Sequence, residues 1–335
     1  MEVEYRFPNL PELNNMHILV NYQNGKINTS LHGRYSLRTW FFVKSYFLFH
    51  DRLVSLKSYA GSTIPSIYTP PIPSQAHARA VESVLSSALY KKFKIPQAVT
   101  IGVTSSCQCN CKHCSAQRRS KTLPDLTTDE LKNIVKQCLD LGIPNITFTG
   151  GEPLLRTDLE EIIFSIPNDK AISLVFTNAL GLTPVRTESL KKAGLFGVHI
   201  SLDSANPEEH DYLRGHQGAF QSVQEGVKNA LKSGLLVGIS TYITRNKALN
   251  HDIIAIADLV AQWGVHAISV FDAIQTGELI GKTGLTLDKG TRNILLKDTK
   301  KISKKYKGKP HIITQTWTNS RSEERRVGKE CIVKC

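Results

Sequence analysis

The sequence lacks an apolar stretch long enough to cross a membrane. Its most apolar run, WFFVKSYFLF at residues 40–49, has only ten residues and contains Lys44, whereas a spanning helix needs about 20 apolar residues. The first residues, MEVEYRFPNL, also lack the basic segment and the apolar stretch of an export signal. We therefore expect a cytoplasmic protein without a transmembrane segment. Residues 40–49 are expected to form a buried helix or strand, and docking on a membrane surface is the alternative.

Cysteine is scarce outside one short segment. Of the seven cysteines, four lie between residues 107 and 114. Zinc sites normally take two separated pairs of N or S ligands, and no second pair lies near this segment. His113 could complete a Cys3His set, but ligands this close in sequence rarely reach one tetrahedron. Disulfides are also disfavoured, because the cysteines are clustered and no export signal precedes them.

Acidic residues are outnumbered by basic ones. The chain has 42 Lys and Arg against 29 Asp and Glu, which gives a net charge of +13. This balance favours anionic partners such as a nucleotide cofactor, an acidic peptide or a membrane surface. The charges are dispersed and do not form the basic groove with interleaved aromatic residues that binding to nucleic acid requires.

The last residues of the chain are set apart from the rest. RSEERRVGKEC at residues 321–331 coincides with one reading frame of a widely used sequencing adapter. We interpret residues 321–335 as an assembly artefact, exclude Cys331 and Cys335 from the candidate ligands, and expect the natural protein to continue beyond Ser320. Without this tail the net charge falls by two, from +13 to +11.

From residue 96 the hydrophobic pattern alternates between strand and helix. Six strands are predicted, at 98–104, 145–153 (with its terminal loop), 171–178, 197–203, 235–244 and 266–271. Helices are predicted between and after them, at 127–141, 158–166, 187–193, 219–233 and 252–263. This order predicts an α/β fold with a parallel sheet and right-handed crossovers. The carboxyl ends of its strands would form one functional rim.

The regions on either side of this alternation are harder to assign. The pattern of residues 1–60 does not allow a known module to be assigned. Residues 62–75 are Pro-rich and predict an extended linker or wrap, and residues 76–93 predict an amphipathic helix. A lysine-rich helix is predicted at 286–306 and a strand at 311–316. The predicted organisation is an N-terminal region of unknown role (1–95), a core (96–284), the start of a C-terminal extension (285–320) and the adapter-like tail (321–335).

Three cysteines directly after the first strand of the core are spaced as C-x3-C-x2-C, namely Cys107, Cys111 and Cys114. Three thiolates on one loop can hold three irons of a [4Fe-4S] cluster and leave the fourth iron open to a substrate. A cluster closed by four cysteines normally only passes electrons. Cys109 offers another thiol in the same loop, but it lies outside this spacing, and we interpret it as a bystander.

This spacing, followed by GGEP at residues 150–153, resembles the radical S-adenosylmethionine (radical SAM) enzymes. The resemblance covers about residues 96–280 and implies a partial (β/α)6 TIM-like barrel with a small mixed N-terminal region and an incomplete C-terminal extension. It also implies that the open iron binds S-adenosylmethionine. One electron, from reduced flavodoxin or ferredoxin, then releases a 5′-deoxyadenosyl radical that abstracts hydrogen from a substrate.

The resemblance suggests cofactor-binding residues near the cysteines. Gly150 and Gly151 would let the backbone approach the ligand closely, and Glu152 would contact the amino group of S-adenosylmethionine. His113, just before the third cysteine, would lie beside the adenine, although it could equally be a polar residue that fills the loop. No catalytic acid or base can be named from the sequence.

HISLDSANPEEHDYLRG, at residues 199–215, resembles the molybdopterin-precursor and pyrroloquinoline-quinone maturation (SPASM-type) branches of the family. There Ser201 would face the ribose or the carboxylate of the cofactor, and Asp203 would either bind the cofactor or cap the following loop. Arg214 is a candidate for carboxylate binding, with a helix-surface position as the alternative. Asn178-Ala179 differs from the Asn-Gly that usually follows the third strand.

The substrate is not evident from the sequence. A peptide or protein is our first expectation, and the precursor of a small cofactor or a tetrapyrrole is the second. The resembling branches commonly carry auxiliary iron–sulfur clusters in a cysteine-rich C-terminal extension. The alternative to an enzyme is a non-catalytic iron–sulfur protein for electron transfer or sensing, in which Cys109 would be the nearest fourth ligand.

Overall fold

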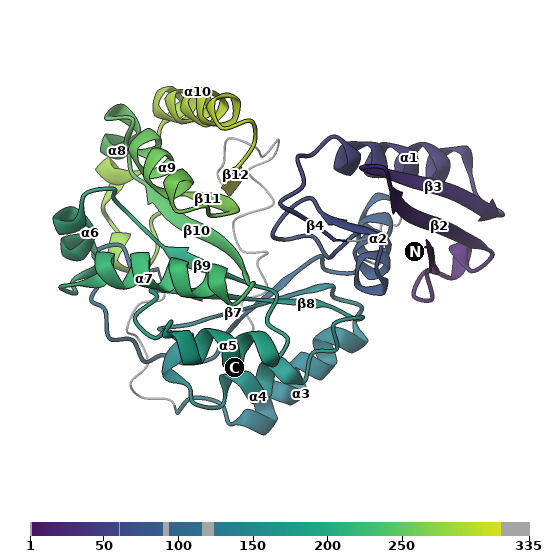
Figure 1. Cartoon of the computed structure of the whole chain (residues 1–335), viewed down its shortest axis with the longest axis horizontal. Coiled ribbons are helices and arrows are strands. Elements are labelled where there is room, and N and C mark those ends of the chain that lie inside the picture. Colours follow the sequence, from purple (N-terminus) through teal and green to yellow (C-terminus); the bar gives the residue numbers. More distant parts are fainter. Residues whose placement is uncertain (1, 60, 90–93, 116–123, 316–335) are drawn as a thin grey trace.

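The computed structural model describes residues 2–59, 61–89, 94–115 and 124–315 (Figure 1). Most of the chain forms a seven-stranded parallel sheet in the order β12-β11-β10-β9-β8-β7-β6. Its strands are β6 (Val99–Gly102), β7 (Asn145–Thr149), β8 (Ile172–Thr177), β9 (Gly197–Ser201), β10 (Leu236–Ile243), β11 (Ala267–Asp272) and β12 (His311–Gln315). Neighbouring strands follow chain order, as they do in a partial barrel whose edges are β6 and β12. The predicted α/β class and parallel sheet are confirmed.

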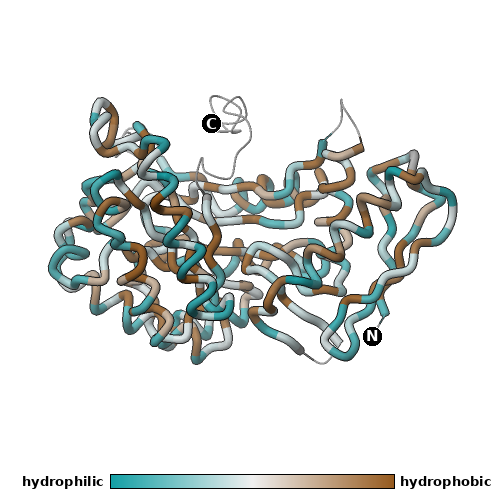
Figure 2. Tube along the Cα trace, turned by 90° about the horizontal axis from the view of Figure 1, so that it is seen from above, coloured by the Kyte–Doolittle hydropathy of each residue, from teal (hydrophilic) through white to brown (hydrophobic). Residues whose placement is uncertain are grey.

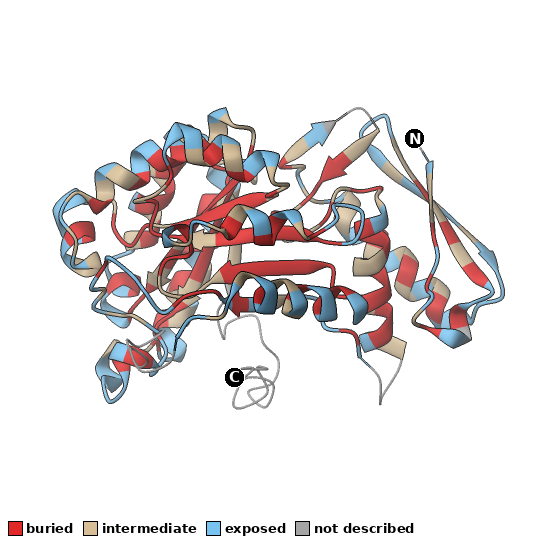
Figure 3. Ribbon diagram, turned by 90° about the horizontal axis from the view of Figure 1, so that it is seen from below, coloured by how far each residue is buried: buried red, intermediate tan, exposed pale blue. Residues whose placement is uncertain are grey.

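Helices cover the outer face of this sheet (Figure 1). They are α3 (Thr128–Asp140), α4 (Leu159–Phe164), α5 (Pro184–Lys192), α6 (Pro207–Arg214), α7 (Ala219–Lys232), α8 (Arg245–Leu249), α9 (Asp252–Gln262) and α10 (Lys289–Lys305). Short 3-10 helices lie at Pro11–Leu13, Pro153–Leu155, Gly277–Leu279 and Thr283–Leu285. Helix α3 starts with the predicted capping box between Thr127 and Glu130. The inner strands β7 to β11 are buried along most of their length (Figure 3), because helices cover one face and the barrel interior covers the other. The edge strand β6 has exposed residues at Thr100 and Gly102.

The predicted C-terminal extension belongs to the barrel. Strand β12 pairs in parallel with β11, and α10 packs against α8 and α9. The barrel therefore continues to residue 315, and the boundary expected at residue 284 does not separate two units. Residues 316–320 and the adapter-like tail at 321–335 lie outside the described residues.

The N-terminal region forms a lobe of its own beside the barrel (Figure 1). An antiparallel sheet in the order β1-β2-β3 packs with two helices around a separate apolar core that includes Tyr5, Ile18 and Phe47. The elements of this lobe are β1 (Glu2–Tyr5), β2 (Met16–Gln23), β3 (Lys26–Gly33), α1 (Leu37–Asp51), β4 (Lys57–Tyr59), β5 (Ser62–Ile64) and α2 (Gln75–Leu89). Apolar residues consequently recur along both parts of the molecule (Figure 2).

The apolar run at residues 40–49 lies within helix α1. A helix was one of the two predicted forms, but burial is limited to one side: Val43 and Phe47 are buried, whereas Phe41 and Phe49 are exposed. Among the described residues, no helix is both long and apolar enough to span a bilayer. The helix predicted at 76–93 is α2, and residues 90–93 lie outside the described part of the chain.

The Pro-rich segment at 62–75 forms the floor of the barrel. Ile64 and Ile67 are buried against Leu174 and Leu236, which point inward from β8 and β10. Tyr68 enters the barrel from the same segment, and its hydroxyl lies 3.0 Å from the Ser269 hydroxyl. The predicted wrap is therefore a plug at the amino ends of the strands, and it ties the N-terminal lobe to the barrel.

Candidate functional site

The cysteine loop leaves the carboxyl end of β6 and is anchored on the two glycines after β7. The backbone N–H of Gly151 donates to the Thr104 carbonyl at 2.7 Å, and that of Glu152 donates to the Ser106 carbonyl at 2.8 Å. A Cβ atom on Gly150 would lie 2.3 Å from the Thr104 oxygen, and one on Gly151 would lie 2.1 Å from the Ser106 oxygen. Only glycine therefore permits this close approach, and here the approaching backbone belongs to the cysteine loop.

Glu152 links the ends of β7 and β8. Its side chain is buried, and its carboxylate accepts hydrogen bonds from the Leu154 N–H at 3.0 Å, the Thr177 hydroxyl at 2.7 Å and the Asn178 N–H at 2.7 Å. Burial raises the pKa of Glu152 to about 7, although these hydrogen bonds act in the opposite direction. The Glu152 carboxylate, which is expected to contact the amino group of S-adenosylmethionine, thus also holds together the backbone at the ends of β7 and β8.

The thiols of the loop differ in exposure and in protonation. Cys107 is exposed, Cys111 and Cys114 are half-buried, and Cys109 is buried. Contact with the Cys109 thiol, whose one S–H can donate to either neighbouring sulfur, is the main cause that lowers the pKa of Cys107 to about 6 and that of Cys111 to about 7. The same two contacts, with burial, raise the pKa of Cys109. The loop therefore favours two thiolates at positions of the C-x3-C-x2-C motif.

The donor chemistry of this loop fits an iron–sulfur cluster, because thiolates are the ligands that such clusters take. Within the described residues, no three His, Cys, Asp or Glu side chains are already gathered as a metal site. The Cys109 thiol contacts both Cys107 and Cys111. It could therefore take the place of Cys114 as the third thiol beside them. Its sulfur also accepts a hydrogen bond of 3.3 Å from the Asn178 amide. Cys109 is thus closer to the motif thiols than its interpretation as a bystander suggested.

Asn178 belongs to the turn in which this sequence differs from the usual Asn-Gly. Ala179 takes φ of +71°, a left-handed conformation that costs an L-residue about 1–2 kcal/mol. Ala179 thus adopts the left-handed conformation that glycine favours, and the Asn178 side chain contacts the cysteine loop.

Helix α6, which the sequence pattern did not reveal, supports the loop from the other side. The N–H groups of Asn110 and Lys112 donate to the carbonyls of Arg214 and Leu213, both at 2.9 Å. The Arg214 guanidinium also donates to the Cys111 sulfur at 3.8 Å. Arg214 is therefore not on the helix surface, because its side chain is turned into the site. Asn206 as N-cap and Pro207 at the first position are start signals that could have revealed this helix.

Asp203 and Arg214 form a buried ion pair, with 2.7 Å between Nε of the arginine and Oδ2 of the aspartate. His113 Nε2 lies 3.4 Å from the same oxygen. Burial opposes ionisation of Asp203, but Arg214, His113 and Lys247 outweigh it and lower the pKa of Asp203 to about 2. Among the described residues the main partner of Asp203 is thus Arg214, and both predicted roles of Asp203 stay predictions.

His113 stacks on Tyr242 from β10, with 4.0 Å between ring centroids and 15° between ring planes. Burial lowers the pKa of His113 to about 4, so this ring is neutral at physiological pH. Together the two rings form a flat aromatic platform beside the cysteine loop.

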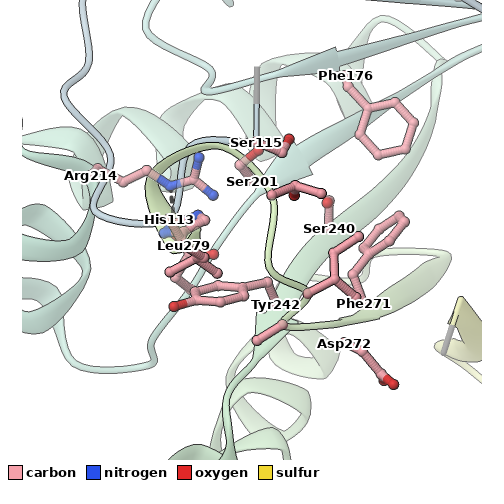
Figure 4. A pocket seen from close by; sticks show the side chains of 14 residues that line it. His113, Ser115, Phe176, Ser201, Arg214, Ser240, Tyr242, Phe271, Asp272 and Leu279 are labelled. Carbon is pink, nitrogen blue, oxygen red and sulfur yellow. Dashed lines mark ion pairs between the residues drawn. The ribbon is translucent and has the colours of Figure 1, made fainter. Parts of the chain in front are cut away.

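These groups border a cavity of about 300 Å³ at the carboxyl ends of the strands (Figure 4). Ser201 and Ser240 line it from β9 and β10, and Phe176 and Phe271 line it from β8 and β11. Of the predicted cofactor-binding residues, Ser201, Asp203 and His113 line this cavity, whereas Gly150, Gly151 and Glu152 lie behind the cysteine loop.

The loop after β11 roofs the cavity, and sequence reasoning missed it. Thr276 and Leu279 line the cavity, and the Glu278 N–H donates to the Cys114 carbonyl at 2.9 Å. Gly277 makes this approach possible, because a Cβ there would lie 2.0 Å from the Cys114 oxygen. The loop after β11 contains no recognisable sequence motif, so its place over the cavity becomes evident only from the structure.

Known proteins with similar sequences were found for the middle part of this chain. The sequence profile of the Radical SAM superfamily matches residues 101–260. An AdoMet-dependent heme synthase of Nitratidesulfovibrio vulgaris is 33% identical over 181 residues, covering 53% of this chain and 48% of that protein. A probable GTP 3′,8-cyclase of Methanocella arvoryzae is 33% identical over 155 residues, covering 46% of this chain and 50% of that protein. The chain therefore spans about half the length of the curated relatives it matches.

A solved structure shares the fold. SuiB of Streptococcus suis, bound to S-adenosylmethionine, superposes with a TM-score of 0.56 at 19% identity, covering 71% of this chain and 54% of SuiB. At this identity the likeness concerns the fold alone.

Proposed function

This chain belongs to the radical SAM superfamily through residues 101–260, and we propose that it cleaves S-adenosylmethionine and abstracts hydrogen from a substrate held in the barrel cavity. The main support for this proposal is that the cysteine loop borders the cavity at the carboxyl ends of the strands. A [4Fe-4S] cluster, when bound, supplies the electron that splits the sulfonium into methionine and a 5′-deoxyadenosyl radical.

Cys107, Cys111 and Cys114 would hold the cluster. Two of these thiols have a lowered pKa, so they are available as thiolates near neutral pH. Arg214 contacts the Cys111 sulfur and would stabilise negative charge there, while Asp203 holds the guanidinium in place. Asp203 would thus act on the cofactor mainly through Arg214.

The cavity wall provides groups for S-adenosylmethionine. The stacked rings of His113 and Tyr242 offer a flat surface for the adenine, and the Ser201 hydroxyl offers a hydrogen bond to the ribose or carboxylate. Gly150, Gly151 and Glu152 do not line this cavity, so their predicted contact with the amino group of S-adenosylmethionine would be made beside the cysteine loop. The loop after β11 would limit the access of water and oxygen to the radical.

The substrate of the proposed reaction is a peptide, a protein or a cofactor precursor. The curated relatives named heme synthase and GTP cyclase support the precursor. A cavity that Phe176 and Phe271 line together with the hydroxyl groups of Ser201 and Ser240 suits an aromatic or apolar group of either class. Reduced flavodoxin or ferredoxin would donate the electron, in the cytoplasm.

The proposal is tested by an anaerobic assay for 5′-deoxyadenosine with the reconstituted protein. The wild type should form it from S-adenosylmethionine and a reductant, and Cys111→Ala should not. Cys138→Ala, at a buried cysteine on α3, is the matched control and should retain activity. Equal product from the wild type and Cys111→Ala would refute the proposal.

A second candidate, a non-catalytic iron–sulfur protein, is favoured by one observation. Cys109 is a fourth thiol in contact with Cys107 and Cys111, and it could close the cluster. In that case Cys109→Ala would lose iron together with Cys107→Ala. In a radical SAM enzyme, Cys109→Ala should keep about four irons per chain, and iron analysis distinguishes the two.

A further inference from the structure

Helix α1 presents large apolar side chains to solvent. The exposed fractions are 71% for Leu37, 58% for Phe41, 50% for Leu48 and 60% for Phe49. Single exposed apolar residues are common on protein surfaces, but a contiguous group on one helix marks an interaction site. The same helix buries Thr39, Val43 and Phe47 in the N-terminal lobe. It is therefore apolar on two sides, and the N-terminal core covers only one of them.

The exposed side is also basic. With about 100° of rotation per residue, Leu37, Phe41, Leu48 and Phe49 lie on one arc of about 120°, opposite the buried side. Two exposed arginines, Arg38 and Arg52, lie on this arc together with Ser45. The Arg38 guanidinium also donates a hydrogen bond of 2.9 Å to the Ala88 carbonyl of α2, which holds it at the border of the arc. We call Leu37, Phe41, Leu48, Phe49, Arg38 and Arg52 the apolar–basic face.

The acidic residue of the helix is turned away from this face. Asp51 is the only Asp or Glu in α1, and its carboxylate accepts a hydrogen bond of 2.8 Å from the Ile27 N–H of β3. The apolar–basic face thus carries positive charge without a negative charge of its own. This combination is complementary to an anionic surface and not to a neutral one.

The neighbouring strand edge disfavours an extended peptide as the partner. Besides the Ile27 N–H, which Asp51 binds, the Thr29 carbonyl accepts a hydrogen bond of 2.9 Å from Lys44 Nζ. Two backbone groups of the edge strand β3 are therefore already occupied by side chains of α1. A peptide strand added there would have to displace both contacts.

We propose that the apolar–basic face docks on the surface of an anionic lipid bilayer. Exposed Leu and Phe side chains flanked by arginines are what a helix lying in the interface requires: the apolar groups enter the acyl boundary, and the guanidinium groups meet the phosphates. Helix α1 lies on the outer side of the N-terminal lobe (Figure 1), so it can meet a flat surface. Docking leaves the barrel cavity on the other part of the molecule accessible.

Vesicle sedimentation with the full chain tests this proposal. The protein should bind vesicles of phosphatidylcholine mixed with phosphatidylglycerol, bind vesicles of phosphatidylcholine alone much more weakly, and be released by salt. Phe41→Ser/Leu48→Ser should weaken binding more than about tenfold, because two large side chains no longer enter the membrane. The matched control is Phe164→Ser/Val185→Ser, at side chains 77% and 79% exposed on α4 and α5, which should bind like the wild type.

A charge variant and a fluorescence measurement complete the test. Arg38→Glu/Arg52→Glu should lose the preference for phosphatidylglycerol, whereas Lys300→Glu/Lys304→Glu on α10 should keep it. Trp40 lies outside the arc of this face, so the fluorescence probe is Phe49→Trp, and the emission of this variant should shift to the blue on binding. Equal binding by the face variants and their controls would overturn the proposal. So would a dimer in solution that Phe41→Ser/Leu48→Ser dissociates, because a second copy would then cover the face.

Discussion

The rim and the interior of the barrel bury polar groups in opposite ways. At the carboxyl ends of the strands, Asp203 is fully buried but lies 2.7 Å from Arg214. In the barrel interior, halfway along β9, His199 is also fully buried, yet within the described residues neither ring nitrogen has a hydrogen-bond partner. His199 stacks between Tyr68 and Phe176, with ring centroids 4.9 and 4.6 Å away. The rim is stabilised by an ion pair, whereas the interior is stabilised by aromatic packing.

This contrast separates groups that position the site from groups that fill the barrel. A buried charge is tolerated only when a partner offsets the loss of hydration, so the paired residues at the rim fix the geometry around the cysteine loop. A neutral imidazole costs less to bury, and burial lowers the pKa of His199 to about 3. His199 can therefore serve as a flat aromatic ring that packs between Tyr68 and Phe176.

The largest effect is expected from Asp203→Asn at the rim. The change leaves the Arg214 charge buried without its anion, so the free energy of unfolding should fall by about 3–5 kcal/mol. Urea unfolding measures this loss. Asp258→Asn is the control: it breaks an exposed pair with Lys305 and should cost at most about 1 kcal/mol. Equal losses in both variants would mean that the rim pair is no more structural than a surface one.

A smaller effect is expected from Gly151→Ala beneath the cysteine loop. The added Cβ would lie 2.1 Å from the Ser106 oxygen, so the backbone must move, at a cost of about 2–3 kcal/mol. Iron incorporation should fall with stability because the root of the loop shifts. Gly284→Ala, where no atom lies within 4 Å, should change neither. Normal iron content in Gly151→Ala would contradict the anchoring role of this glycine.

The stability that His199 contributes in the barrel interior should depend on pH. His199 stays neutral in the folded protein but takes up a proton when unfolded, so its stabilising contribution is complete above pH 6.5 and is lost as the pH falls toward 3. His199→Phe keeps an aromatic ring and removes this proton uptake. The loss of stability below pH 6.5 should then be shallower by about 1.4 kcal/mol per pH unit. Urea midpoints between pH 7 and 5 measure the slope, and identical slopes would show that His199 does not titrate on unfolding.

Much of the barrel could be predicted because its strands and helices follow local rules. Apolar runs such as 171–178 and 197–203 coincide with β8 and β9, and the Thr127–Glu130 capping box marks the start of α3. The seventh strand was expected as part of an extension, because a strand at residues 311–316 gives no sign of the strand it pairs with. Short helices such as α8, with five residues, are too brief for a periodic pattern.

The site was predictable in its chemistry and not in its contacts. The spacing of Cys107, Cys111 and Cys114 marks the loop from sequence alone, but nothing local shows that Arg214 returns to the Cys111 sulfur. Tyr68 likewise meets Ser269 across 201 residues of sequence. Such contacts arise from the closure of the sheet, so they become visible only once the strands are placed in space.

The most direct test of the central claim is an EPR spectrum of the anaerobically reconstituted and reduced protein, recorded with and without S-adenosylmethionine. A cluster held by Cys107, Cys111 and Cys114 keeps one iron open, so the spectrum should change when S-adenosylmethionine is added. Identical spectra in both conditions would contradict the account and would indicate a closed cluster that only passes electrons.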